Sequence, residues 1–461
     1  MALIKPFRAL RPLQKIVKQV AAPPYDVMSV AEARCMAEGN PFSFLHVSRP
    51  EIDLAVDVDP HDESVYRKGR ENLEKLITQQ ALVQDQEEHY YIYRQKMGSV
   101  VQTGLVACAS VDDYQSGLIR KHELTRADKE EDRVRHIDFL DANDEPVFYV
   151  YRHVATISEL IARLTEREPL YDFTTEDSVV HTVWAVSDPL IIRRISDAFA
   201  GIKTLYVADG HHRSAAASRV RDLRKAKNPG HNGSEEYNYF LTVIFPDNEM
   251  NVMAYNRAVR DLNGHTIAEF ITKVGKKFDV TPVSEPVVPS HRHNFGMYLM
   301  GKWYELTPRH GLFDENDAVA RLDVSILQEY LLSPILGVRN PRTDQRIHFV
   351  GGSRGTDELV KLVDGGTFQV SFSLHPTSID ELMALADGHA GLARDTRPAV
   401  QAAPRLLDGL LQGEAPLVER KVQAFFGGDP HHVRLMAVVL RMPLGDLEAR
   451  IGPAAAGGEV E

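Results

Sequence analysis

The alternation of apolar and polar positions along the chain predicts intermixed strands and helices. Mostly apolar runs bounded by turn residues predict strands at 42–47, 90–95, 100–110, 147–154, 179–186, 202–208 and 239–245. Apolar positions three or four residues apart predict helices at 29–39, 63–80, 127–143, 157–166, 189–200 and 214–223. Because the two kinds of element alternate irregularly, we expect a mixed α/β or α+β fold.

A second set of elements follows the loop at Asn263-Gly264. The pattern there predicts helices at 267–277, 323–332 and 378–387, and strands at 295–307, 347–351 and 368–373. From about Gly388 the composition shifts to Ala, Gly, Pro and Arg, while helical periodicity persists at 417–426 and 431–441. Since 461 residues exceed one ordinary core, we expect a first domain over 1–263, a second α/β domain over 264–387 and a divergent helical tail over 388–461, its end disordered.

Composition and charge narrow the class of protein. A net charge of −12 argues against a dedicated nucleic-acid binder, which needs a basic face to neutralise phosphates. The chain has no apolar run long enough for a membrane span and no apolar signal-peptide core, so we expect a cytoplasmic protein without a membrane partner. The two cysteines, Cys35 and Cys108, are predicted to be buried free thiols.

The most informative motif lies between a predicted strand and a predicted helix, and it reads Asp209-Gly210-His211-His212-Arg213. A glycine turn at a helix start exposes backbone N–H groups, and the helix dipole adds partial positive charge there. Arg213 adds a full positive charge, and the two histidines add donors or one proton acceptor. The motif therefore predicts an anion site, most often for phosphate; the alternative is an ordinary turn with a polar helix start.

The strand–Asp-Gly-His-His-Arg–helix unit resembles the nucleotide-binding signature of the ParB/sulfiredoxin-like superfamily. In that superfamily a Gly-x-His-Arg-type loop holds phosphates, and some members are kinases of free L-serine. More widely, the chain resembles domain-of-unknown-function family ten-fifteen, which is related to that superfamily, from about Pro6 to Asp387. The resemblance is carried by several blocks in order: Ala22-Pro23-Pro24-Tyr25-Asp26-Val27, Asn40-Pro41, Ser43-Phe44-Leu45-His46-Val47, His122-Glu123, Ala142-Asn143, Pro146-Val147-Phe148, Asp209–Arg213, Phe245-Pro246, Tyr255-Asn256-Arg257 and Pro376–Met383.

The resemblance implies a small-molecule phosphotransferase, a kinase of free L-serine or of a similar hydroxylated metabolite. Its first domain would hold a ParB/sulfiredoxin-like nucleotide-binding core, and its donor would be ATP, ADP or pyrophosphate with Mg²⁺. Gly210, His211, His212 and Arg213 would bind the donor phosphates, and Asp209 would hold the metal or orient a histidine. The alternatives are a nucleotide-gated ParB-like binding protein without kinase activity and a non-catalytic scaffold.

Upstream of this loop, His122-Glu123 is similar to a His-Glu pair of the serine kinases. Transfer to a hydroxyl needs a proton acceptor, and the resemblance makes Glu123 the candidate base. The alternative is a solvated charge beside Arg120 and Lys121. The stretch from Glu123 to Asp209 is longer than a compact domain of this superfamily needs, so we expect an insertion containing 127–173 that folds outside the site.

Weaker candidates for substrate contact lie in two further blocks. Tyr25 and Asp26 stand on a proline-fixed loop that could close over a small substrate. His122, of the His122-Glu123 pair, is a further candidate for substrate contact. Asn256 and Arg257 could bind a carboxylate or phosphate, because an arginine can make a bidentate contact. The alternative in each case is ordinary loop packing or a surface pair.

The chain departs from the family near its C-terminus. Related chains carry a block resembling Met-Pro-Pro-Lys-Ser-Thr, whereas the corresponding region here reads Leu392-Ala393-Arg394-Asp395-Thr396-Arg397-Pro398. The lysine of that block is missing, and either its role is dispensable or Arg394 or Arg397 replaces it.

Overall fold

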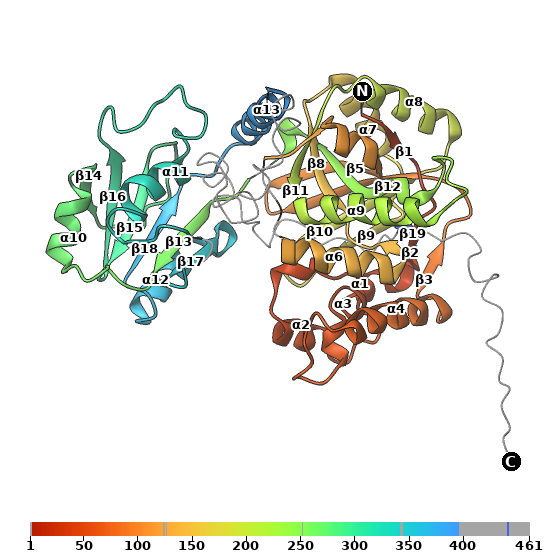
Figure 1. Ribbon diagram of the computed structural model, residues 1–461, viewed down its shortest axis with the longest axis horizontal. Coiled ribbons are helices and arrows are strands. Elements are labelled where there is room, and N and C mark those ends of the chain that lie inside the picture. Colours follow the sequence, from red (N-terminus) through yellow and green to blue (C-terminus); the bar gives the residue numbers. More distant parts are fainter. Residues whose placement is uncertain are drawn as a thin grey trace, which may run out of the picture.

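The computed structural model describes residues 2–122, 125, 127–250, 252–341, 344–395 and 440–441. The fold is mixed α/β, as the sequence predicts. Two bodies stand side by side, each built on its own sheet, and the helix α13 (Ile379–Asp395) lies between them (Figure 1).

In the described part of the chain, the larger sheet has nine strands in the order β6-β11-β8-β12-β5-β4-β10-β9, with β1 paired to β5. Their bounds are β1 (Ile4–Lys5), β4 (Tyr90–Met97), β5 (Val100–Ser110), β6 (Ile119–Arg120), β8 (Val147–Tyr151), β9 (Tyr171–Thr174), β10 (Val180–Val186), β11 (Leu205–Asp209) and β12 (Tyr239–Pro246). The strand β11 runs parallel to β6 on one side and antiparallel to β8 on the other. Consequently β6 and β11 end at the same edge of the sheet.

Helices cover this sheet, and four of them overlap the helices predicted at 127–143, 157–166, 189–200 and 214–223, whereas the helix at Val111–Ser116 was not predicted. They are α5 (Val111–Ser116), α6 (Ala127–Leu140), α7 (Ala155–Leu164), α8 (Pro189–Ala200) and α9 (His211–Lys227). The start of α8 shows why the sequence is informative: the Asp188 carboxylate caps the backbone N–H of Leu190 at 2.8 Å, and Pro189 occupies the first helical position. Small residues Ala216 and Ala217 let α9 pack closely on the sheet.

The segment 127–173 does not fold outside the site, and that expectation is wrong. Its strand β8 is buried at every position and lies in the sheet between β11 and β12. Its helix α6 packs along α9 and buries Arg133, His136 and Ile137. The mixed charges of α6 suggested an exposed layer, but the helix places Arg133 and His136 inward, where Arg133 pairs with Asp132 of the same helix and His136 contacts Asp144.

A smaller layer precedes the sheet. It contains β2 (Leu10–Pro12), α1 (Val17–Val20), α2 (Val30–Ala37), α3 (Leu45–Ser48), α4 (Glu63–Thr78) and β3 (Leu82–Gln84). The helix predicted at 29–39 is α2, and a capping box between Ser29 and Glu32 begins it. The predicted strand at 42–47 is wrong: Leu45–Ser48 form one turn of helix, which packs against α4 and buries Leu45 and Val47.

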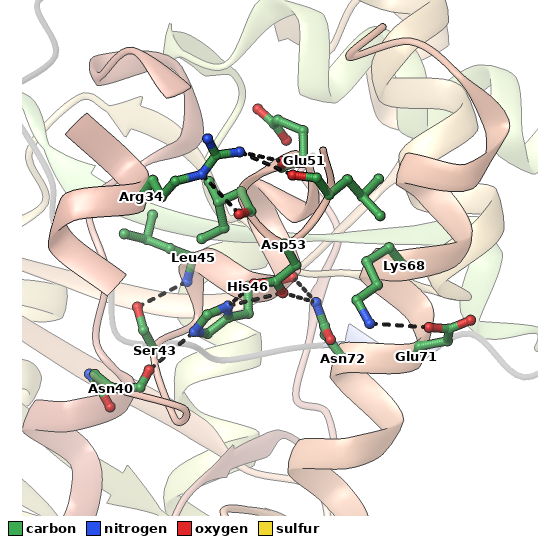
Figure 2. A network of polar contacts seen from close by, with 12 residues as sticks. Arg34, Asn40, Ser43, Leu45, His46, Glu51, Asp53, Lys68, Glu71 and Asn72 are labelled. Atoms are coloured by element: carbon green, nitrogen blue, oxygen red, sulfur yellow. Dashed lines mark hydrogen bonds and ion pairs between the residues drawn. The ribbon is translucent and has the colours of Figure 1, made fainter. Parts of the chain in front are cut away.

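Polar contacts hold α3 against α4 in this layer (Figure 2). The His46 ring places Nδ1 2.9 Å from an Asp53 carboxylate oxygen and Nε2 3.1 Å from the carbonyl oxygen of Asn40. The Asn72 amide donates to the carbonyl oxygen of His46 and to Asp53, each at 2.7 Å. Both nitrogens of His46 are therefore occupied by structural contacts.

The second sheet is antiparallel, with the order β14-β16-β15-β18-β13-β17 among the described residues. Its strands are β13 (Tyr255–Val259), β14 (Phe278–Val283), β15 (Phe295–Leu299), β16 (Lys302–Pro308), β17 (Ile347–Gly351) and β18 (Val370–Leu374). Its helices are α10 (Ile267–Val274), α11 (Asp323–Leu327), continued by a π-helical turn at Gln328–Leu332, and α12 (Gly355–Asp364). Strand β13 lies before residue 263, so this sheet begins upstream of the loop at Asn263-Gly264.

The helix α13 joins the two bodies. Its Leu385 belongs to the core of the second sheet, whereas Met383 and Ala386 pack against Val150 and Tyr206 of the larger sheet. Ion pairs of Asp380 with Arg152 and of Asp387 with Arg120 fix the N-terminal half of the helix to the larger body. No helix within the described ranges is both long enough and apolar enough to cross a membrane.

Two expectations on the chain's cysteines and tail need correction. Cys108 is a buried free thiol as predicted, but Cys35 is exposed. In the tail, Leu440–Arg441 form strand β19, which pairs with β7 (Ala142–Asn143), whereas the sequence predicted the end of a helix. The predicted helix at 417–426, most of that at 431–441 and the disordered end lie outside the described residues.

Candidate functional site

The anion motif lies where β11 passes into α9. Gly210 takes φ +90°, a left-handed conformation that a side chain disfavours, and turns the chain directly into the helix. The register of β11 against β8 shifts between Val207 and Asp209, which re-aims the end of the strand. The first turn of α9 contains no acidic residue, and no described side chain caps it. The partial positive charge of the helix end is thus not neutralised by an acidic residue in that turn.

Arg213 closes the loop back on itself. Its guanidinium donates to the carbonyl oxygen of Pro146 at 2.6 Å and to the carboxylate of Asp209. Burial alone would lower the pKa of Arg213, but Asp209, Glu145 and Asp26 outweigh it and raise that pKa. Arg213 is 7% exposed, so the site holds a nearly buried, permanently positive group.

The parallel pairing of β6 and β11 brings His122 to the same edge of the sheet. The rings of His122 and His211 meet edge to face with centroids 4.4 Å apart. Burial, and then the neighbouring His122, His212 and Lys121, lower the pKa of His211 well below its usual value. His211 is therefore neutral near pH 7, while His212 is half-buried beside it.

The Tyr25-Asp26 loop also reaches this edge. The backbone N–H of Tyr25 donates to Glu145 Oε1 at 3.0 Å, and the Arg133 guanidinium lies 3.9 Å from the centre of the Tyr25 ring. Asp26 retains exposed surface, yet the dense surroundings of its carboxyl raise its pKa by desolvation; Arg213 opposes this shift and Asp209 reinforces it. The loop thus places a second acid beside the arginine of the motif.

Sequence reasoning missed Glu145, a buried carboxyl of the site whose pKa is strongly raised. Its Oε2 is buried, and among the described residues it has no hydrogen-bond partner. Burial and the nearby Asp144 raise the pKa of Glu145 to about 8, although Arg213 and Arg133 pull it down. Glu145 helps to line a small cavity with Arg133, His136, Ile137, Asn143, Asp144, Val147 and Arg213.

A buried contact between a histidine and an aspartate fixes one wall of this cavity. His136 Nε2 lies 2.9 Å from an Asp144 carboxylate oxygen, and both side chains are almost fully buried. Burial would raise the pKa of Asp144, but His136 and Arg133 lower it below the usual value. The sequence signal that could have found this wall is the pair Asp144-Glu145 placed directly before a fully apolar strand, together with charged residues on the apolar face of α6.

The remaining candidates lie elsewhere. Asn256 and Arg257 stand on β13, in the second sheet. The buried Arg257 guanidinium carbon lies 4.8 Å from the centre of the Tyr255 ring and 4.4 Å from the centre of the Phe349 ring. Glu123 and Arg397 lie outside the described residues, and of Arg394 only the backbone is described, as part of α13. The structure therefore assembles Tyr25, Asp26, His122 and the 209–213 loop, and it adds Arg133, Asp144 and Glu145.

The residue set offers little for a resident metal ion. Within the described ranges, no group of three or more His, Cys, Asp and Glu side chains is arranged to hold one. The acids nearest the loop are instead engaged with arginines, as Asp209 is with Arg213. These side chains fit a metal that arrives bound to phosphates better than a metal held by the protein alone.

Comparisons with known proteins were made for sequence and structure. A family model described as "Protein of unknown function (DUF1015)" matches residues 4–325, more than half of the chain. The search of curated proteins returned no significant match.

Three solved structures illustrate the structural likenesses. A free serine kinase variant in complex with AMP is 12% identical, with a TM-score of 0.29 over 62% of this chain and 82% of that one. A conserved hypothetical protein from Pyrococcus furiosus is 12% identical, with a TM-score of 0.29 over 62% of this chain and 84% of that one. SbnI with C-terminal truncation, from Staphylococcus aureus, is 11% identical, with a TM-score of 0.30 over 62% of this chain and 78% of that one. Likenesses of this size carry no argument about activity.

Proposed function

The chain belongs to the DUF1015 family of unknown function, and from that premise and its site we propose that it is a phosphotransferase acting on free L-serine or a similar hydroxylated metabolite. The donor is a nucleotide or pyrophosphate, bound at the Asp209–Arg213 loop. The observation that carries the proposal is one loop that combines a helix start with no cap from a described side chain, a nearly buried arginine and a neutral histidine, with the arginine also lining a small cavity that contains two acids. The larger sheet is the proposed ParB/sulfiredoxin-like core.

Donor binding follows from the loop's electrostatics. The first N–H groups of α9 and the Arg213 guanidinium supply hydrogen-bond donors and positive charge for phosphate oxygens. Mg²⁺ is proposed to enter with the donor phosphates, where it would neutralise charge on the transferred group. A free metabolite and a nucleotide donor fit a cytoplasmic location.

Acceptor activation is assigned to Glu123. This residue directly follows His122, whose ring contacts His211 in the loop. A carboxylate at this point would accept or orient the proton of the attacking hydroxyl as the phosphoryl group is transferred. Tyr25 and Asp26 would close the acceptor side of the cavity, and Asn256 and Arg257 stay candidates for contact with a larger substrate.

The direct test is a thermal-shift screen of ATP, ADP, CTP and pyrophosphate with Mg²⁺, with and without L-serine, followed by detection of phosphoserine. A donor present at about 100 times its Kd should stabilise the protein by about 2.7 kcal/mol. Stabilisation together with phosphoserine formation supports the proposal. Stabilisation without turnover on any hydroxylated metabolite would favour the ParB-like binding protein, and no stabilisation would favour a scaffold.

The substitution Glu123→Gln separates chemistry from donor binding. We expect turnover to fall about a hundredfold, because the hydroxyl loses its proton acceptor, while donor affinity stays near wild type. Single-turnover rates and calorimetric titration with the donor measure the two quantities. Glu63→Gln, at an exposed position on α4, is the control and should change neither. Wild-type turnover in Glu123→Gln would remove this residue from the mechanism.

A further inference from the structure

Glu145 presents a buried, unbonded carboxyl oxygen beside the anion loop. We propose that Glu145 contacts the bound phosphate ligand directly through Oε2, and that this carboxyl, where it is ionised in the free protein, takes up a proton when the ligand binds. The inference rests on the proposed function only in assuming that a phosphate anion binds at the loop, with one of its oxygens reaching into this small cavity. It adds a proton-carrying group to the set of phosphate contacts that the motif provides.

The orientation of Glu145 is fixed by its other oxygen. Oε1 accepts the backbone N–H of Tyr25 at 3.0 Å, and the Tyr25 carbonyl is itself held by Arg49 at 2.6 Å. The carboxyl cannot turn Oε2 toward a described partner without losing that bond. A buried polar oxygen with no partner is costly, so a group that occupies the cavity and hydrogen-bonds Oε2 recovers free energy.

The charges around Glu145 decide which form it takes. The titratable and charged groups that face it are Tyr25 and Asp26 from the Tyr25–Val27 turn, Arg133 and His136 from α6, Asp144 from the β7–β8 connection, and Arg213 from α9, which is itself paired with Asp209. Asp209 and Asp144 are already paired with Arg213 and His136, so they offset much of the positive charge. The Glu145 carboxyl is therefore poorly solvated, and the positive and negative charges around it nearly cancel, so its neutral form is favoured.

A neutral carboxyl suits a phosphate ligand. It can donate its proton to a phosphate oxygen, whereas an ionised carboxylate at the same place would repel that oxygen. The proton comes from solvent as the ligand enters and returns to solvent as it leaves. No bond to phosphorus forms or breaks in this step, so it acts on binding rather than on transfer.

The sign of the pH dependence follows from linkage. In the free protein the pKa of Glu145 is raised to about 8 by burial, so below pH 8 the proton is already present and little is taken up on binding. A bound anion raises that pKa further, so above pH 8 each binding event takes up close to one proton. Affinity should then fall about tenfold per pH unit between the free and bound pKa values.

The experiment is calorimetric titration of the full chain with ADP and, separately, pyrophosphate, at pH values from 7 to 9.5. Each titration is run in two buffers of different ionisation enthalpy, which reports proton uptake in the wild-type protein without any substitution. Glu145→Gln keeps the shape and neutrality of the protonated acid, so its affinity should be flat over this range after the ligand's own ionisation is subtracted. The control is Glu249→Gln. The Glu249 carboxylate lies away from the site and accepts a hydrogen bond from the backbone N–H of Thr103 at 2.8 Å.

The outcomes separate this inference from the proposed function. Binding with uptake that disappears in Glu145→Gln supports the inference, even if no phosphoserine is formed. Binding with no uptake above pH 8, or with the same pH profile in Glu145→Gln, overturns it and leaves the donor site intact. Failure of both ligands to bind at every pH overturns the inference and the proposed donor site together. If Glu145→Gln does not fold, the wild-type two-buffer measurement alone decides.

Discussion

Replacing Arg213 with alanine is expected to abolish measurable donor binding and to destabilise the larger body by about 3–5 kcal/mol. The guanidinium is almost fully buried and bonds both the Pro146 carbonyl and the Asp209 carboxylate. Alanine would leave Asp209 without its cation and the Pro146 oxygen without its donor. A bound phosphate would also lose its charged partner, and we expect donor affinity to fall at least about a hundredfold. Calorimetric titration with ADP and denaturant unfolding measure the two effects.

Arg219→Ala is the matched control on the same helix. Arg219 is 44% exposed at its side chain and makes surface ion pairs with Glu130 and Glu131. Removing it should cost about 0–1 kcal/mol and leave donor affinity unchanged. Arg213→Lys keeps the charge but loses the planar fork, so we expect it to recover only part of the binding. Wild-type ADP affinity in folded Arg213→Ala would show that this loop is not the donor site.

Much of the larger sheet could be predicted from the sequence, because its signals are local. A buried strand such as 239–245 is a continuous apolar run, and α8 is marked by its Asp188 cap and Pro189. The failure at 42–47 has the opposite cause. That run is too short for its period to separate strand from helix, and packing against α4 decides for a single helical turn.

The site was half predictable for a related reason. The glycine turn and Arg213 can be recognised from a motif of five residues, and the apolar run before the motif predicts its position at the end of a strand. Glu145 and Arg133 reach the site only through pairings between distant elements: β8 lies beside β11, and α6 lies along α9. Local patterns carry no information about such pairings, so both residues were missed.

Long-range pairing also separates Asn256 and Arg257 from the loop. Residues 255–259 follow the last strand of the larger sheet closely, and nothing in their pattern shows which sheet they join. In the structure β13 pairs with β17 and β18, two strands that lie about a hundred residues downstream in the sequence. The sequence could therefore identify the block but not its neighbours.

Gly210→Ala is expected to damage both the donor site and the stability of the loop. Gly210 has φ +90°, so any side chain there is strained by about 1–2 kcal/mol. An added Cβ would also lie 3.1 Å from Arg213 Nε and 3.1 Å from Val147 Cγ1. Arg213 cannot move aside freely because Pro146 and Asp209 hold its guanidinium. We expect a total loss of about 2–4 kcal/mol and a donor affinity at least about tenfold weaker.

A second glycine separates strain from crowding. Gly233 has φ +93°, and an added Cβ there meets nothing within 4 Å. Gly233→Ala should thus cost only the backbone strain and leave ADP binding unchanged, so the difference in unfolding free energy between the two variants measures the displacement of Arg213 and Val147. Equal losses in both variants, with equal ADP affinity, would mean that Arg213 tolerates the added methyl group. The close fit between Gly210 and the guanidinium would then have no part in shaping the anion site.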